Sequence, residues 1–247
     1  MNQGKDRFSS HAKQYAAFRP TYPKELYDFI FTHIKKFDTA WDAGTGNGQV
    51  ARDLALKFKK VLATDISEKQ LANAYQAPNI FYSVAGEATI FPDHHIDLIT
   101  VAQAIHWFDI EKFYKEVQRV AHKDALLAVW GYSLLSISPE IDKVLTHFYT
   151  QVVGPYWDKE RKLIDDQYTT IPFPFEEISV PEFKFSFEWT LEEFEGYIST
   201  WSSVQKYITA NQVNPVDDLM KEVRPLWKNK QQTVNFPLFL RLSTGFT

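Results

Sequence analysis

Two acidic residues and a glycine-rich turn stand close together near the start of the chain. Asp42 lies in a short apolar run, and Gly44, Gly46 and Gly48 follow at alternate positions. An amphipathic stretch comes next, and a second apolar run ends at Asp65. Glycines between a strand and a helix let the backbone approach a ligand, and an acid ending the next strand can accept hydrogen bonds from ribose hydroxyls. The spacing predicts a site for a nucleotide-like cofactor.

The residue types in this turn distinguish between cofactors. A nicotinamide-binding turn has its third glycine where this chain has Gln49, and it places a pyrophosphate on the helix N-terminus. A carboxylate at Asp42 would repel a pyrophosphate and would suit a cofactor that carries positive charge and no phosphate, such as S-adenosylmethionine. Asp65 serves either cofactor. A nicotinamide-dependent oxidoreductase therefore remains the enzymatic alternative, and a regulatory protein that binds S-adenosylmethionine without turnover is the alternative outside enzymology.

The elements that must position these residues alternate in the manner of a doubly wound sheet. Short apolar runs and helix-like segments follow one another up to His122, which predicts an α/β, Rossmann-like fold. We expect seven strands, mostly parallel, with an antiparallel strand near the C-terminus. The predicted strands are residues 39–43, 61–65, 80–84, 96–101, 125–130, 182–189 and 233–242. The predicted helices are residues 23–34, 50–58, 109–122, 191–204 and 216–227, with a further helix capped by Ser67.

Length and composition limit the class of protein. The 247 residues suffice for one buried core, so we expect a single domain. Its predicted parts are an N-terminal cover (1–37), a cofactor-binding core (38–131), a lid or insertion (132–180) and a C-terminal region of sheet and helices (181–247). The chain has no cysteine, which excludes disulfides and thiolate metal sites, and we expect no metal.

Charge and hydropathy indicate the partners. The net charge of −4 weighs against a nucleic-acid partner, because phosphate binding favours a basic surface. No apolar run approaches the length of a membrane span, and the first residues lack the apolar core of a signal peptide. We therefore expect a cytoplasmic monomer or homodimer that acts on a small molecule, with no membrane partner.

Several motifs resemble a known family. DAGTGNG, the acid that ends LATD, and AGEATIFPDHHIDLITVAQAIHWFD together resemble the class I S-adenosylmethionine-dependent methyltransferases. FSSHAKQYAAFRPTYP and AQAIHWF are more specific, and resemble the small-molecule branch that includes the trans-aconitate methyltransferases. The core motifs cover residues 38–130, and the C-terminal third carries no motif that we can assign. The place after the fourth strand lacks the polar-Pro-Pro-aromatic motif common in nucleic-acid and protein amino-methyltransferases, which favours a small-molecule acceptor.

The resemblance implies a set of contacts to S-adenosylmethionine and to its product S-adenosylhomocysteine. Asp65 would bind the ribose hydroxyls, and Ile66 would pack on the adenine. Glu87 would accept from the adenine amino group and the Ala88 amide would reach the ring, although the family often has the shorter Asp at position 87. The residues expected along the methionine moiety are Asp42, Gly44, Gly46 and Gln103.

The acceptor side has three candidate residues. Methyl transfer is an in-line displacement that needs alignment and exclusion of water, and an ionised carboxylate acceptor needs no base. His106 could be a base, a donor to an anionic acceptor, or a residue that orders its loop. Arg19 could clamp a substrate carboxylate or form a structural ion pair. Tyr15 is a candidate wall residue of the same N-terminal cover.

Overall fold

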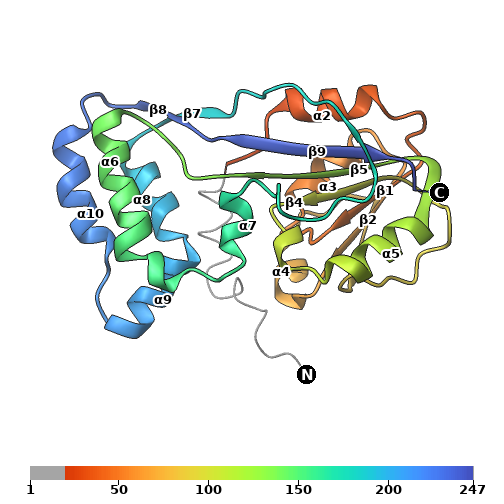
Figure 1. Ribbon diagram of the computed structural model, residues 1–247, viewed down its shortest axis with the longest axis horizontal. Coiled ribbons are helices and arrows are strands. Elements are labelled where there is room, and N and C mark those ends of the chain that lie inside the picture. Colours follow the sequence, from red (N-terminus) through yellow and green to blue (C-terminus); the bar gives the residue numbers. More distant parts are fainter. Residues whose placement is uncertain (1–19, 247) are drawn as a thin grey trace.

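A seven-stranded sheet dominates the computed structural model, which describes residues 20–246 (Figure 1). Its strands are β1 (Thr39–Ala43), β2 (Lys60–Asp65), β3 (Ile80–Val84), β4 (Ile96–Ala102), β5 (Ala121–Tyr132), β6 (Glu176–Ile178) and β9 (Leu238–Thr244). They are ordered β3-β2-β1-β4-β5-β9-β6. β9 runs antiparallel to both neighbours, whereas the pairs from β3 to β5 are parallel. The predicted Rossmann-like sheet is confirmed.

Helices cover both faces of the sheet. The flanking helices are α2 (Lys24–Thr32), α3 (Gln49–Ala55), α4 (Glu68–Ala72) and α5 (Ile110–Val120). Successive strand residues face opposite sides, so Ala40 packs with α2 and α3 while its neighbour Trp41 packs with α5. Every residue of β1 is buried, as expected for a central parallel strand. Because the strand order reverses between β1 and β4, the connections that follow these two strands lead to helices on opposite faces of the sheet, and a crevice for a ligand is expected at their carboxyl ends.

A second group of elements lies at the end of the sheet toward which β5 runs (Figure 1). It consists of α6 (Pro139–His147), α8 (Leu191–Ser199), α9 (Ser202–Asn211), α10 (Val216–Val223) and the antiparallel pair of strands β7 (Ser186–Trp189) and β8 (Gln232–Asn235). This helical lobe has its own core, which is rich in aromatic residues. The short helix α7 (Arg161–Asp165) stands between the lobe and the sheet in Figure 1. Within residues 20–246, no helix combines the length and apolarity needed to cross a membrane.

The C-terminal third differs from the sequence prediction at three places. The single strand predicted for residues 233–242 is two strands, because β8 ends at Asn235 and β9 begins at Leu238. Pro237 lies in the break, where its missing N–H interrupts no ladder. The helix predicted for residues 191–204 is likewise divided into α8 and α9. The third difference is β6, a strand that the sequence analysis did not predict. It joins the seven-stranded sheet, whereas the strand predicted for residues 182–189 is the shorter β7, which pairs with β8 in a separate sheet.

Candidate active site

The glycine turn follows β1 and bends its backbone through conformations that favour glycine. Gly44, Gly46 and Gly48 have φ angles of 70°, 56° and 76°, in the left-handed region. The amides of Gly44 and Thr45 donate to the Thr64 carbonyl oxygen at 2.8 and 2.9 Å, which fastens the turn to β2.

The three glycines of the turn differ in what surrounds them. A Cβ atom added to Gly44 would lie 2.7 Å from the Ala104 Cβ, and one added to Gly48 would lie 2.2 Å from the Tyr82 hydroxyl. A Cβ added to Gly46 would meet no atom of residues 20–246 within 4 Å. Gly44 and Gly48 therefore allow close packing within the protein, whereas Gly46 borders open space that a ligand can fill.

Asp65 ties the glycine turn to the loop after β2. Its Oδ2 accepts from the Gly46 amide at 2.9 Å, and its Oδ1 accepts from the Ser67 amide at 2.9 Å. The carboxylate thus lies beside Gly46 in the glycine turn.

Asp42 is more enclosed than a residue in direct contact with a ligand. It is 1% exposed, and its two oxygens accept from the hydroxyls of Thr45 at 2.5 Å and Thr100 at 2.8 Å. Burial raises the pKa of this carboxyl to about 6, although the hydroxyl hydrogen bonds oppose the shift. Above this pKa the ionised Asp42 places a buried negative charge beneath the turn.

The residues predicted for the adenine side lie in two loops. Ile66 follows β2 and is 50% exposed, which is unusual for an isoleucine and leaves a surface for an aromatic ring. Glu87 lies after β3, and its Oε1 accepts from the amide of Asp109, the N-cap of α5. Ala88 beside it is exposed. Arg119, which the sequence analysis missed, steadies this loop by donating to the Phe91 carbonyl at 2.7 Å.

Gln103 holds two strands together. Its Nε2 donates to the Tyr132 carbonyl at 3.1 Å, and its Oε1 accepts from the Tyr132 amide at 3.0 Å. The residue has a φ of 53°, and a Cβ added to Gly131 would lie 2.4 Å from its Oε1. The amide predicted to line the methionine end is thus bonded to β5, and it fixes the start of the loop that carries His106.

His106 is buried beside a tyrosine from the loop after α7. It is 7% exposed, and its Nδ1 lies 2.8 Å from the hydroxyl oxygen of Tyr168, a fully buried residue. Burial, with a smaller effect from the Arg161 charge, lowers the pKa of His106 to about 3. The imidazole is therefore neutral near neutral pH. Tyr15 and Arg19, the other predicted acceptor contacts, lie outside the described residues.

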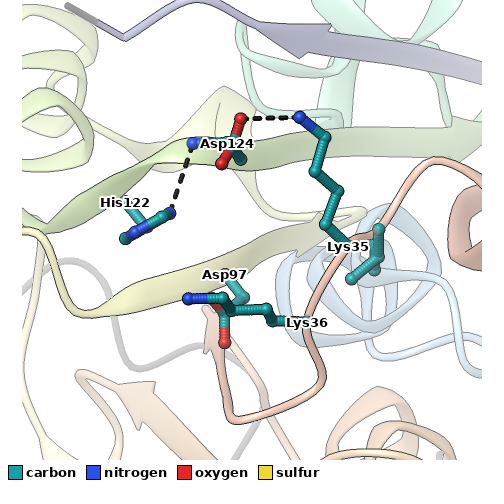
Figure 2. Close-up of a pocket in the computed structure, with 6 residues that line it drawn as sticks. Lys35, Lys36, Asp97, His122 and Asp124 are labelled. Carbon is teal, nitrogen blue, oxygen red and sulfur yellow. Dashed lines mark hydrogen bonds and ion pairs between the residues drawn. The ribbon is translucent and has the colours of Figure 1, made fainter.

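A hollow at the other end of the sheet is separate from this site (Figure 2). Its lining residues are Ile34, Lys35, Lys36, Asp97, His122 and Asp124. Asp97 and Asp124 lie near the starts of β4 and β5, whereas the glycine turn follows the end of β1. The protein itself satisfies these acids: Lys35 pairs with Asp124 at 2.8 Å, and the amides of Asp38 and Thr39 donate to Asp97.

The fold and the site together define an α/β protein that binds a nucleoside-containing cofactor at the carboxyl ends of its parallel strands. Gly46 leaves the space, Asp65 borders it, Ile66 offers an exposed apolar surface, and Asp42 supplies negative charge. This set fits S-adenosylmethionine, which joins a ribose and an adenine to a cationic methionine end.

Comparison with known proteins gives the family. A model described as a methyltransferase domain matches residues 41–129. A methyltransferase of Dictyostelium discoideum is 36% identical over 96% of this chain and 94% of its own length. The S-adenosylmethionine-dependent methyltransferase CRG1 of Saccharomyces cerevisiae is 24% identical over 94% of this chain and 92% of its own. The solved structure of a type II methyltransferase from Anaeromyxobacter dehalogenans superposes with a TM-score of 0.85 at 33% identity, covering 92% of this chain and 98% of that one.

The two relatives and the solved structure match almost the whole chain, whereas the family model covers residues 41–129. The chain belongs to the class I S-adenosylmethionine-dependent methyltransferases, and S-adenosylmethionine is its cofactor. The nicotinamide alternative, which Gln49 and Asp42 already disfavoured, is thereby set aside.

The Asp65→Ala variant tests the ribose contact. We expect it to weaken S-adenosylmethionine binding by about 1.5–3 kcal/mol, the scale for hydrogen bonds to a charged group. Calorimetric titration measures the change, and Asp124→Ala, which removes an acid at the other end of the sheet, should bind like the wild type. Unchanged affinity in Asp65→Ala would remove this residue from the site.

Asp42 predicts a pH dependence of cofactor binding. Its carboxyl loses its charge as the pH falls below about 6, so the affinity for the cationic cofactor should fall in the same range. The Asn variant should bind more weakly near neutral pH, and its affinity should change less as the pH falls from about 7 to about 5. Titrations of both proteins at several pH values measure this, and parallel profiles would show that Asp42 is not the titrating group.

Proposed function

We propose that the protein transfers the methyl group of S-adenosylmethionine to a small anionic metabolite, with O-methylation of a carboxylate as the favoured reaction. The carrying observation is the buried contact between His106, in the loop that packs against the glycine turn, and Tyr168 from the loop after α7. A histidine with a pKa near 3 is a poor base for a phenol or an amine near neutral pH. A carboxylate acceptor is already ionised and needs no base.

Methyl transfer to an ionised carboxylate requires no general acid or base from the protein. S-adenosylmethionine supplies an electrophilic methyl group; a carboxylate oxygen of the acceptor forms the new bond as the carbon–sulfur bond breaks, and the electron pair stays on sulfur. The protein's part is to align the acceptor and exclude water. In this proposal His106 orders the acceptor loop through Tyr168, while Tyr15 and Arg19 remain further candidate contacts on the strength of the family resemblance.

The cofactor contacts belong to the same proposal. Asp65 and Ile66 would hold the ribose and adenine, with Glu87 and the Ala88 amide at the rim of the ring. Gly44 and Gly46 would follow the methionine moiety above Asp42. Gln103 would act indirectly, because its amide is bonded to Tyr132.

The proposed partners follow from charge and motif. A net charge of −4 and the absent polar-Pro-Pro-aromatic motif support a small-molecule acceptor over a nucleic acid. The narrower resemblance to trans-aconitate methyltransferases supports a carboxylate. We further propose that the protein works in the cytoplasm as a monomer or homodimer.

Turnover with chemically distinct acceptors tests the reaction. Purified protein is incubated with S-adenosylmethionine and separate sets of carboxylates, phenols and amines, and S-adenosylhomocysteine is quantified. We expect product only with carboxylates, and mass spectrometry should identify methyl esters. Turnover with phenols or amines alone would overturn the proposed acceptor class. Tight cofactor binding with no turnover on any set would favour a regulatory binding protein.

A further inference from the structure

Arg161 is a partly buried cation at the start of α7, between the sheet and the helical lobe. Its side chain is 18% exposed. The guanidinium lies 4.7 Å from the ring centre of Trp157 and 5.4 Å from that of Tyr149. Its Nε donates to the Tyr149 hydroxyl at 2.7 Å, and that hydroxyl donates to Asp165 Oδ1 at 2.7 Å. Two aromatic rings and one hydrogen bond therefore hold the guanidinium in place.

The other edge of this guanidinium has no hydrogen-bond acceptor in the part of the chain that the structure describes. Within residues 20–246, the hydrogen bonding of Arg161 runs through Nε alone, and the Asp165 oxygen nearest to Nε is 3.5 Å away. The two terminal nitrogens carry four N–H donors in a planar fork that matches the two oxygens of a carboxylate. By contrast, Arg241 and Arg119 use their terminal nitrogens on carbonyl and carboxylate oxygens of the protein. Arg161 is thus fixed on one side and open on the other.

Arg161 also lies on the methyl side of the cofactor site. The loop after β4 touches the glycine turn, because a Cβ on Gly44 would lie 2.7 Å from Ala104. Two residues on, His106 contacts Tyr168 from the loop after α7. The helix α7, which begins at Arg161, packs against the turn Ile105–Trp107 that carries His106. The Arg161 charge accordingly contributes to the lowered pKa of His106. Neighbouring segments therefore connect the glycine turn to the helix that carries this cation.

We infer that Arg161 binds a carboxylate of the methyl acceptor through its terminal nitrogens, and so determines specificity for an anionic small molecule. This inference rests on the proposed function and deepens it by naming the residue and the chemical class that it recognises. Tyr149 and Asp165 hold the Nε side, so the fork is pre-organised and little side-chain entropy is lost when an acceptor binds.

The test measures anion binding separately from turnover. Protein saturated with S-adenosylhomocysteine is titrated with a set of aliphatic and aromatic mono- and dicarboxylates, each paired with its carboxamide. We expect at least one carboxylate to bind the wild type more tightly than its carboxamide. Arg161→Gln should lower the affinity for that carboxylate by about 10- to 100-fold, the range for a hydrogen bond to a charged group. The affinity for its carboxamide should not change.

Three further variants or readouts make the test specific. Arg224→Gln removes an exposed arginine of the helical lobe and should bind like the wild type. Arg161→Lys keeps the positive charge but lacks the planar pair of terminal nitrogens, so its affinity for the carboxylate should lie between those of the wild type and Arg161→Gln. It replaces Arg161→Gln in the test if that variant does not fold. The affinity for S-adenosylhomocysteine should stay the same in both Arg161 variants, because the residue binds the acceptor and not the cofactor.

Two results would overturn the inference. One is that the carboxylate preferred by the wild type over its carboxamide binds Arg161→Gln just as tightly. The other is a wild-type protein that binds no carboxylate better than its carboxamide. S-adenosylhomocysteine formation is assayed on the same set, so carboxylate binding without methyl transfer would contradict the proposed reaction and leave the role of Arg161 intact.

Discussion

Replacing Gly46 with valine is expected to abolish S-adenosylmethionine binding while the protein still folds. A Cβ at this position meets no atom of the described residues within 4 Å, so the new side chain would enter the space assigned to the cofactor. Overfilling a packed site costs about 3 kcal/mol, which corresponds to a loss in affinity of ~100-fold or more. The residue also has a φ of 56°, and a branched side chain there strains the turn that Asp65 holds.

Gly46→Val could lose cofactor binding through backbone strain rather than through the filled space, so a control variant with strain alone is needed. Gly245 follows β9 with a φ of 79°, and a Cβ there would make only ordinary contact, 3.6 Å from Glu176. Gly245→Val therefore imposes similar strain far from the glycine turn. Both variants are compared with the wild type by circular dichroism, thermal unfolding and cofactor titration. Only Gly46→Val should lose binding, and wild-type affinity in that variant would mean that the cofactor lies elsewhere.

The strands of the cofactor-binding core could be predicted from the sequence because local patterns determine them. The predicted strands 39–43 and 80–84 have the observed bounds of β1 and β3, since each is an apolar run ended by turn residues. The caps Ser67 and Asp109 were also predicted, because an N-cap depends on a side chain and an amide only three residues apart.

The C-terminal third was predicted less well because long-range pairing decides its structure. An alternating run such as residues 233–242 fits one strand, and nothing local shows that β8 pairs with β7 while β9 joins the central sheet. The same limit applies to the site. Tyr168 and Arg161 lie far along the chain from His106, so only the fold could bring them together.

Two buried titratable groups make opposite contributions to stability as the pH falls. His106 has a pKa of about 3 in place of the ordinary 6.5. Between these values the histidine is protonated in the unfolded chain but not in the folded protein, so the free energy of unfolding decreases as the pH falls. Asp42 has a pKa of about 6 in place of 3.8. Between these values the carboxyl is protonated in the folded protein but not in the unfolded chain, so the free energy of unfolding increases as the pH falls. In the wild type the two contributions offset each other over this range.

The His106→Gln variant should expose this balance as a rise in relative acid stability. Glutamine does not titrate, and its amide can still bond to Tyr168, so the variant keeps the gain from Asp42 and avoids the loss from His106. The free energy of unfolding of the variant minus that of the wild type should increase by about 3 kcal/mol from about pH 6 to about pH 4, at 1.36 kcal/mol for each pH unit. Urea unfolding at constant ionic strength measures the difference. His147→Gln removes an exposed histidine at the end of α6 and controls for the substitution itself. A difference that stays constant with pH would show that His106 takes up its proton in the folded protein as readily as in the unfolded chain. The histidine would then be basic enough to serve as a general base, and the argument for a carboxylate acceptor would be lost.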